Sequence, residues 1–121
     1  MGIIGKSIRT FIGSENYNIS RSFYLDLGFE ELIISEKMSY FRIGTLGFYL
    51  QDYYVKDWID NSMIFLEVDD VEACLKDIKS LGLTEKYENV RLSEINDNSW
   101  GKVFFLHDPC GILWHIGMFY V

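Results

Sequence analysis

The feature that most constrains the fold of this chain is an internal repeat. Leu27-Gly28-Phe29, at the end of a helical pattern in the first half, recurs as Leu81-Gly82-Leu83 at the end of a helical pattern in the second half. Each helical pattern is preceded by one predicted strand and followed by three. We therefore predict an α+β fold of two tandem βαβββ units, whose curved mixed sheets, each covered on one face by a helix, enclose a cleft.

Apolar alternation and turn-forming residues set the elements of the first unit. Asn16 or Asn18 is expected to cap its helix, and Gly28 to end it with a positive φ. The strands of this unit are predicted at residues 3–12, 29–35, 39–43 and 47–51.

The second unit repeats this order. A strand is predicted at residues 63–69, a helix from Asp70 to Gly82, a strand at residues 83–90 and a polar loop at residues 91–99. The unit then closes with a hairpin. Its two strands, residues 103–106 and 112–116, flank the turn Asp108-Pro109-Cys110-Gly111.

A connector is expected between the units. We predict that residues 1–121 form one domain, with units at residues 1–52 and 62–121 joined by residues 53–61. The connector carries bulky aromatic residues that a spacer would not need. They either pack on the body or border a pocket, and we expect packing. These residues are Tyr53, Tyr54 and Trp58.

Composition limits the partners. Aromatic residues make up 17% of the chain, more than one small core needs, which favours an aromatic-lined cleft or interface. The net charge of −7 argues against a nucleic-acid partner and is compatible with a cationic ligand, although acidic surfaces also simply keep proteins in solution.

The sequence has no signal peptide and no long apolar run, and its two cysteines fit no metal or redox spacing. We therefore expect a cytoplasmic protein with free thiols and no membrane partner.

The last predicted strand decides what faces the cleft. Because successive strand residues point to opposite sides, His115 shares a face with Leu113 and Gly117, while Trp114 points the other way.

Four motifs occur in order along the chain. Because of these motifs, the chain resembles the vicinal oxygen chelate superfamily, which includes glyoxalase I, extradiol dioxygenases, fosfomycin-resistance enzymes and bleomycin-resistance proteins. Trp-Gly ahead of the penultimate strand, in a short acidic chain, makes the resemblance closest to the bleomycin-resistance branch. The resemblance implies a homodimer and leaves open whether the cleft lies within one chain or across the dimer. The motifs are Ser22-Phe23-Tyr24-Leu25-Asp26-Leu27-Gly28-Phe29, Leu66-Glu67-Val68-Asp69-Asp70-Val71, Trp100-Gly101 and Asp108-Pro109-Cys110-Gly111.

The resemblance also implies where a metal would bind. Metal-dependent members hold their ion with one His or Glu on each of the first, fourth, fifth and eighth strands. The matching positions in this chain are Ser7, Tyr49, Met63 and His115. Only His115 would serve well, because a hydroxyl, a protonated phenol and a thioether are poor ligands for a divalent ion. We therefore expect no metal and no cofactor.

Each of two titratable residues on the cleft side could have either a structural or a functional role. His115 is either a hydrogen-bonded lining residue or the acid/base partner of Glu67. Glu67 is either a solvated carboxylate at the end of its strand or the group that holds a ligand's cation or amide. Nothing in the sequence shows that the two side chains touch, so we assign no catalytic residue.

Two functions follow from the resemblance. The first, which the residues favour, is a metal-free protein that sequesters a planar or cationic small molecule in an aromatic cleft by binding rather than catalysis. Whether any reaction is catalysed stays open at this point. The alternative is a lyase, isomerase or dioxygenase whose divalent metal is held by His115 with Glu67 or other displaced ligands. The expected ligand-binding residues are Tyr49, Gln51, Met63, Phe65, Glu67, Trp100 and His115, with Arg9 and Phe41 as further candidates.

Overall fold

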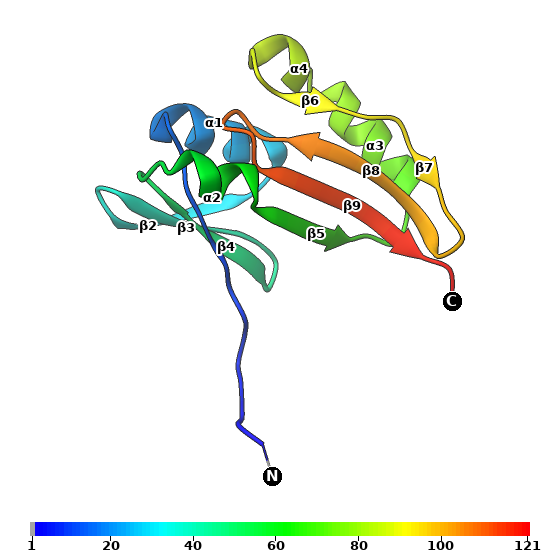
Figure 1. Ribbon diagram of the computed structural model, residues 1–121, viewed down its shortest axis with the longest axis horizontal. Coiled ribbons are helices and arrows are strands. Elements are labelled where there is room, and N and C mark those ends of the chain that lie inside the picture. Colours follow the sequence, from blue (N-terminus) through cyan, green and yellow to red (C-terminus); the bar gives the residue numbers. More distant parts are fainter. Residues whose placement is uncertain (1) are drawn as a thin grey trace.

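Two sheets with the same internal strand order make up the molecule (Figure 1). The computed structural model describes residues 2–121, so Met1, the first residue of the predicted domain, lies outside the described residues. The strand orders are β1-β4-β3-β2 and β5-β9-β8-β6, with β7 also paired to β8. In each sheet the first strand runs parallel to the last strand of its unit, and the other pairs are antiparallel. This matching order confirms the predicted fold of two βαβββ units with mixed sheets.

The bounds of the elements agree with most of the sequence predictions. None of the helices in the described range 2–121 is long and apolar enough to cross a bilayer. The strands of the first sheet are β1 (Phe11–Ile12), β2 (Glu30–Ser35), β3 (Met38–Ile43) and β4 (Leu46–Gln51). Those of the second are β5 (Met63–Glu67), β6 (Arg91–Leu92), β7 (Asn96–Asp97), β8 (Gly101–His107) and β9 (Leu113–Phe119). The helices are α1 (Tyr17–Leu27), α2 (Lys56–Asp60), α3 (Val71–Ser80) and α4 (Leu83–Lys86).

Side-chain caps explain where the two long helices begin. The Asn16 side chain accepts a hydrogen bond from the Ile19 amide at 3.2 Å, and the Asp70 carboxylate accepts one from the Ala73 amide at 3.0 Å. Gly28, with φ of 110°, ends α1 in the left-handed conformation. Of the two predicted caps, Asn16 is therefore the one that the helix uses.

One hydrophobic cluster joins both sheets and both long helices. The ring of Tyr24, on α1, lies 4.8 Å from that of Phe48 in the first sheet and 6.0 Å from that of Trp114 in the second, centroid to centroid. α1 therefore connects the cores of the two units. Because the helices cover one face of each sheet, the opposite face of each sheet stays open.

A buried carboxylate fixes the turn between β8 and β9. One oxygen of Asp108 accepts hydrogen bonds from the backbone N–H groups of residues 110–112, each at 2.9 Å. The other accepts the Tyr24 hydroxyl at 2.7 Å, and that hydroxyl in turn accepts the Trp114 indole N–H at 3.0 Å. Burial raises the pKa of Asp108, and these hydrogen bonds act in the opposite direction. The turn is thus tied to the core by polar as well as apolar contacts.

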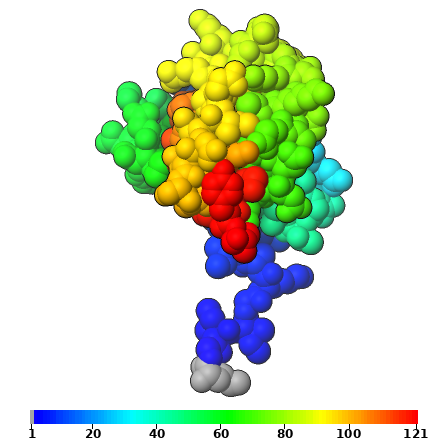
Figure 2. Space-filling model, turned by 90° about the vertical axis from the view of Figure 1, so that its right-hand side faces the viewer, coloured from blue at the N-terminus to red at the C-terminus, as the bar shows by residue number. Residues whose placement is uncertain are grey.

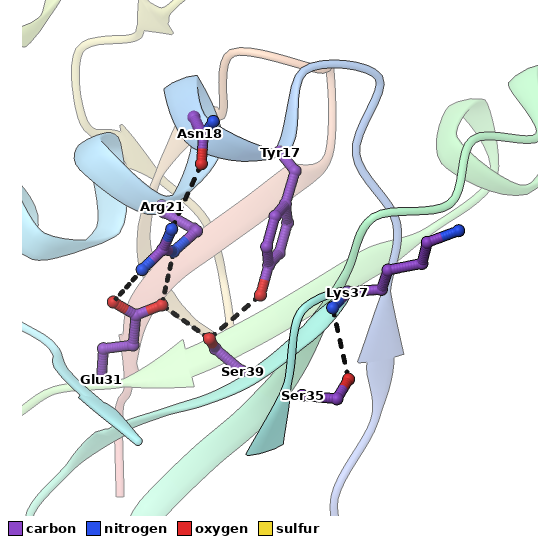
Figure 3. Close-up of polar contacts among 7 residues, drawn as sticks. All are labelled: Tyr17, Asn18, Arg21, Glu31, Ser35, Lys37 and Ser39. Carbon is purple, nitrogen blue, oxygen red and sulfur yellow. Dashed lines mark hydrogen bonds and ion pairs between the residues drawn. The ribbon is translucent and has the colours of Figure 1, made fainter. Parts of the chain in front are cut away.

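A second polar network fastens α1 to the first sheet (Figure 3). Arg21 donates to both carboxylate oxygens of Glu31, at 2.6 and 3.0 Å. Ser39 donates to the same carboxylate at 2.6 Å and accepts the Tyr17 hydroxyl at 3.0 Å. The forked Arg–Glu pair fixes the distance between helix and strand.

The predicted strand at residues 83–90 is wrong. The chain instead forms α4, in which the Lys86 amide donates to the Gly82 carbonyl at 3.1 Å. The buried residues of this stretch are Leu83, Tyr87 and Val90, which are spaced by four and three, a helical rather than an alternating period. The predicted polar loop that follows contains two short strands, β6 and β7, which pair with β8.

The predicted strand at residues 3–12 is also wrong for most of its length, because only β1 pairs. Phe11 lies opposite Tyr49 in a parallel register, so Ile8 is level with Leu46, the first residue of β4. Residues before Ile8 therefore extend beyond their partner strand. We call residues 2–10 the N-terminal arm. Its outer part runs away from the body (Figures 1 and 2), and the side chains of Ile3 and Ile8 are fully exposed. Arg9 and Thr10, at its base, are hydrogen-bonded to Tyr49.

The aromatic residues of the connector do not pack on the body as expected. Trp58 is 64% exposed and Tyr53 54% exposed, and their rings contact each other at a centroid distance of 5.7 Å. The connector forms the short helix α2, and it is Ile59 that is buried in the core.

Candidate functional site

The open face of the second sheet is lined by alternate residues of β5, β8 and β9. Phe65 is the cross-strand neighbour of His115, which is the neighbour of Phe105, so the three side chains form a row across the sheet. The next residues along the strands, Phe104 and Trp114, are buried in the core. The predicted opposite orientation of His115 and Trp114 is confirmed.

Two further rings extend this row into an aromatic surface. The Phe119 ring stacks on that of Phe65 at a centroid distance of 5.4 Å, and Trp100 lies 5.2 Å from Phe119. These three residues are each 41–46% exposed. Rings held in mutual contact yet half open to solvent offer a surface on which a flat apolar group can stack. We call Phe65, Trp100, Phe105, His115 and Phe119 the open aromatic face.

His115 is the polar group within the open aromatic face. Its ring is nearly perpendicular to those of Phe105 and Phe65, at centroid distances of 5.0 and 6.2 Å. Its Nε2 atom is buried and has no hydrogen-bond partner among residues 2–121. A buried polar atom without a partner is uncommon and costs free energy. Nε2 is therefore an unsatisfied polar atom covered by its own chain, and a ligand could bond to it only if the side chains around it moved.

The open face of the first sheet carries a second set of aromatic residues. Phe11 stacks on Tyr49 at 4.7 Å, and the Tyr40 ring lies 5.2 Å from that of Tyr49. Arg9 donates a hydrogen bond to the Tyr49 hydroxyl at 2.9 Å. Gln51 lies two residues from Tyr49 on the same strand and therefore on the same face.

The predicted ligand-binding residues fall on both sheets. Phe41 does not line either open face: it is fully buried in the core, 5.7 Å from Tyr24, because it alternates with Tyr40 along β3. A cavity of about 790 Å³ brings Arg9 and Tyr40 together with Phe65 and Glu67, where the first sheet meets β5. The second sheet carries Met63, Phe65, Glu67 and His115, and Trp100 directly precedes its strand β8. The first sheet and the arm carry Arg9, Tyr49 and Gln51.

Sequence reasoning missed three residues of these faces. Phe105 is the cross-strand neighbour of His115 within the predicted hairpin, and Phe119 follows His115 at an even spacing along the same strand. Strand alternation would therefore have found both. Tyr40 could be found only once β3 was in register with β4, because its place depends on which of Tyr40 and Phe41 faces α1.

The residues at the four metal-ligand positions do not fit a divalent ion. Ser7 lies on the N-terminal arm, and Tyr49 lies on the first sheet with its hydroxyl bonded to Arg9. Met63 and His115 both lie on the second sheet, where they would offer one thioether and one imidazole. In the described part of the chain, residues 2–121, no three His, Cys, Asp or Glu side chains are grouped to hold a metal ion.

No hydrogen bond joins Glu67 and His115 in the described residues. Burial raises the pKa of the Cys74 and Cys110 thiols, which disfavours their thiolate forms. Burial and the nearby Arg91 lower the pKa of His107, which favours its neutral imidazole.

The fold matches solved structures over nearly its whole length. Neither a protein-family model nor a curated protein matches the chain by sequence. A bleomycin resistance determinant encoded on the transposon Tn5 matches with a TM-score of 0.81 and 20% identity, over 96% of this chain and 100% of that one.

Two other solved structures are similar in the same way. A bleomycin-binding protein complexed with bleomycin matches with a TM-score of 0.80 and 19% identity, over 96% of this chain and 100% of that one. The fosfomycin resistance protein FosX from Listeria monocytogenes, complexed with Mn(II) and sulfate, matches with a TM-score of 0.72 and 16% identity, over 98% and 94%. At these identities the likeness establishes the fold and leaves the function to the site. The chain thus has the fold of the vicinal oxygen chelate superfamily, to which bleomycin-resistance proteins belong.

Proposed function

We propose that this protein is a metal-free small-molecule-binding protein that sequesters a planar or cationic compound on its open aromatic face. The observation that carries the proposal is the cluster of half-exposed rings around His115, whose buried Nε2 has no partner among residues 2–121. Glu67, exposed on the same strand face as Phe65, provides a carboxylate for a ligand's cation. Two structures with this fold are of bleomycin-binding or bleomycin-resistance proteins, which supports the same class of ligand.

We do not propose a metal-dependent enzyme. FosX shares the fold and was solved with Mn(II), but the four matching positions of this chain offer a hydroxyl, a phenol and a thioether beside one imidazole. No feature of the site favours that alternative over binding.

We further propose that the working unit is a homodimer in the cytoplasm. Each chain leaves two aromatic sheet faces uncovered and extends an apolar arm into solvent, and a second copy would cover both. The ligand would then lie between Tyr49 and Gln51 of one protomer and the open aromatic face and Met63 of the other. The two free cysteines fit a reducing compartment.

Titration with bleomycin and with a planar cationic dye such as acridine orange tests the proposal. Binding should quench tryptophan fluorescence, because Trp100 lies on the open aromatic face while Trp114 is buried. Trp100→Phe should remove most of the quenching but keep the calorimetric affinity within a few-fold. Trp100→Ala should weaken binding by about tenfold or more.

The matched control is Trp58→Ala, because Trp58 is exposed on the connector, outside the open aromatic face. It should leave the affinity unchanged. Absence of binding across both compounds, or an equal loss in Trp58→Ala, would contradict the proposal. So would stoichiometric metal in the purified protein that is lost on His115→Ala.

A further inference from the structure

The cavity between the arm and β5 is lined by the guanidinium of Arg9, which two side chains of the first sheet hold in place. The guanidinium carbon of Arg9 lies 4.2 Å from the centroid of the Tyr40 ring, and its Nη1 donates to the Tyr49 hydroxyl at 2.9 Å. The backbone at this point is also fixed, because the Tyr49 amide donates to the Thr10 carbonyl at 2.9 Å. Stacking on Tyr40 and the hydrogen bond to Tyr49 thus fix the position of the Arg9 charge, although its side chain is exposed.

The platform under this cation depends on Gly47. The Tyr40 ring lies over Gly47, where a Cβ atom would overlap its hydroxyl end. Tyr40 is consequently only 7% exposed, and its face is covered by the guanidinium. Arg9 therefore packs against a buried aromatic ring, which restricts its side chain more than an open surface would.

Arg9 also has no carboxylate partner. The chain holds 18 acidic and 11 basic residues. Arg21 and Arg42, the two other arginines near the first sheet, both pair with a glutamate. No carboxylate of residues 2–121 lies within 4.0 Å of the Arg9 guanidinium. The remaining donors of Arg9 are left for a group outside the chain.

The cavity next to Arg9 combines polar donors with an apolar wall. Its volume of about 790 Å³ falls within the range of small-molecule sites. Glu67 is the one carboxylate among the described lining residues. The lining residues that can donate hydrogen bonds include Lys6, Ser7, Arg9, Thr10 and Thr45, and the apolar ones include Phe29, Phe48, Ile64, Leu66 and Trp114.

We propose that this cavity binds the anionic group of an amphipathic small molecule, with the carboxylate, sulfonate or phosphate on Arg9 and the apolar part against the wall. A guanidinium with unpaired N–H donors can bind two oxygens of such a group at once. The cavity shares Phe65 and Glu67 with the proposed cation site. The inference goes beyond the proposed function, because it assigns an acidic ligand group to the Arg9 side of that cavity.

Two fluorescent probes of similar shape test this inference. 1-Anilinonaphthalene-8-sulfonate carries an anion, and N-phenyl-1-naphthylamine is its neutral counterpart. The sulfonate should bind more tightly to the wild-type protein, and its affinity should fall as salt is raised, while that of the neutral probe should not. Arg9→Gln should reduce the affinity for the sulfonate by roughly tenfold and leave that for the neutral probe unchanged, and Arg9→Lys should lie between.

Arg42→Gln is the matched control, because Arg42 is an exposed guanidinium on the same sheet whose charge is already paired with Glu30. It should leave both affinities unchanged, and circular dichroism and thermal unfolding should show that each variant is folded. Equal affinities for the two probes, or equal losses in Arg9→Gln for both, would overturn the inference. Neither result would affect the proposed function, which depends on Trp100 and cationic ligands.

Discussion

Glu31 is the carboxylate on which the attachment of α1 to the first sheet depends. Hydrogen bonds from Arg21, assisted by one from Ser39, hold the pKa of Glu31 below its usual value of 4.5. A carboxyl whose pKa is lower in the folded state stabilises the fold above the unfolded pKa. That contribution is lost as the pH falls through the folded value. The wild-type protein should therefore lose stability below about pH 4.5.

Glu31→Gln should lower the free energy of unfolding at pH 7 by about 2 kcal/mol and flatten the acid dependence. Urea unfolding at a series of pH values measures both. Glu30→Gln is the control, since Glu30 pairs with Arg42 at the surface with 72% of its side chain exposed. It should change the stability by less than about 0.5 kcal/mol. An equal effect of the two variants would show that the network in Figure 3 adds no more stability than an exposed ion pair.

At the scale of elements, the hairpin of β8 and β9 depends on one buried side chain. Asp108→Ala would leave three turn amides and the Tyr24 hydroxyl without their acceptor. We expect a loss of about 3 kcal/mol in the free energy of unfolding, measured with urea at pH 7. Asp52→Ala, at an exposed position, should be nearly neutral. A loss of less than about 1 kcal/mol in Asp108→Ala would mean that water replaces the carboxylate.

Strong periodicity made most elements predictable from the sequence. α1 and α3 were predicted because each has an amphipathic stripe, a side-chain cap and a glycine at or just beyond its end. The stretch at residues 83–99 was predicted wrongly because its apolar residues are sparse and its strands have only two residues each. Such short strands form through pairing with β8, which local sequence does not encode.

The candidate site could be predicted only in part. Alternation correctly separated His115 from Trp114, and the family resemblance put His115 on the cleft side. The misplaced Phe41 shows that a face cannot be assigned without the register of β3 and β4. The role of Arg9 was even less visible, because it depends on Tyr40 lying over Gly47, a contact between strands. Strand-to-strand contacts, rather than local pattern, decide which side chains share a site.

At the scale of the whole molecule, the N-terminal arm is the part that its own chain does not stabilise. One hydrophobic cluster joins both units, which favours the single domain that we propose over two independent ones. The arm lies outside that cluster, and three of its residues, Ile3, Ile4 and Ile8, are almost completely exposed. Burying each would contribute about 2 kcal/mol. Two arms buried reciprocally in a dimer would contribute about 12 kcal/mol before the entropic cost of association, which is the largest single gain that the exposed residues of the arm offer.

Deleting residues 2–8 should convert the proposed dimer into a monomer while leaving the circular dichroism spectrum unchanged, because the deletion keeps the bond between Thr10 and Tyr49. Sedimentation velocity over a range of protein concentrations measures the change. Replacing Ile3, Ile4 and Ile8 together with serine separates apolar burial from chain length, and should have the same effect. A full-length protein that stays monomeric at tens of micromolar, or a deletion variant that still dimerises, would contradict the arm's role. In the second case the open sheet faces alone would hold the dimer, because they are the other apolar surface that the chain leaves uncovered.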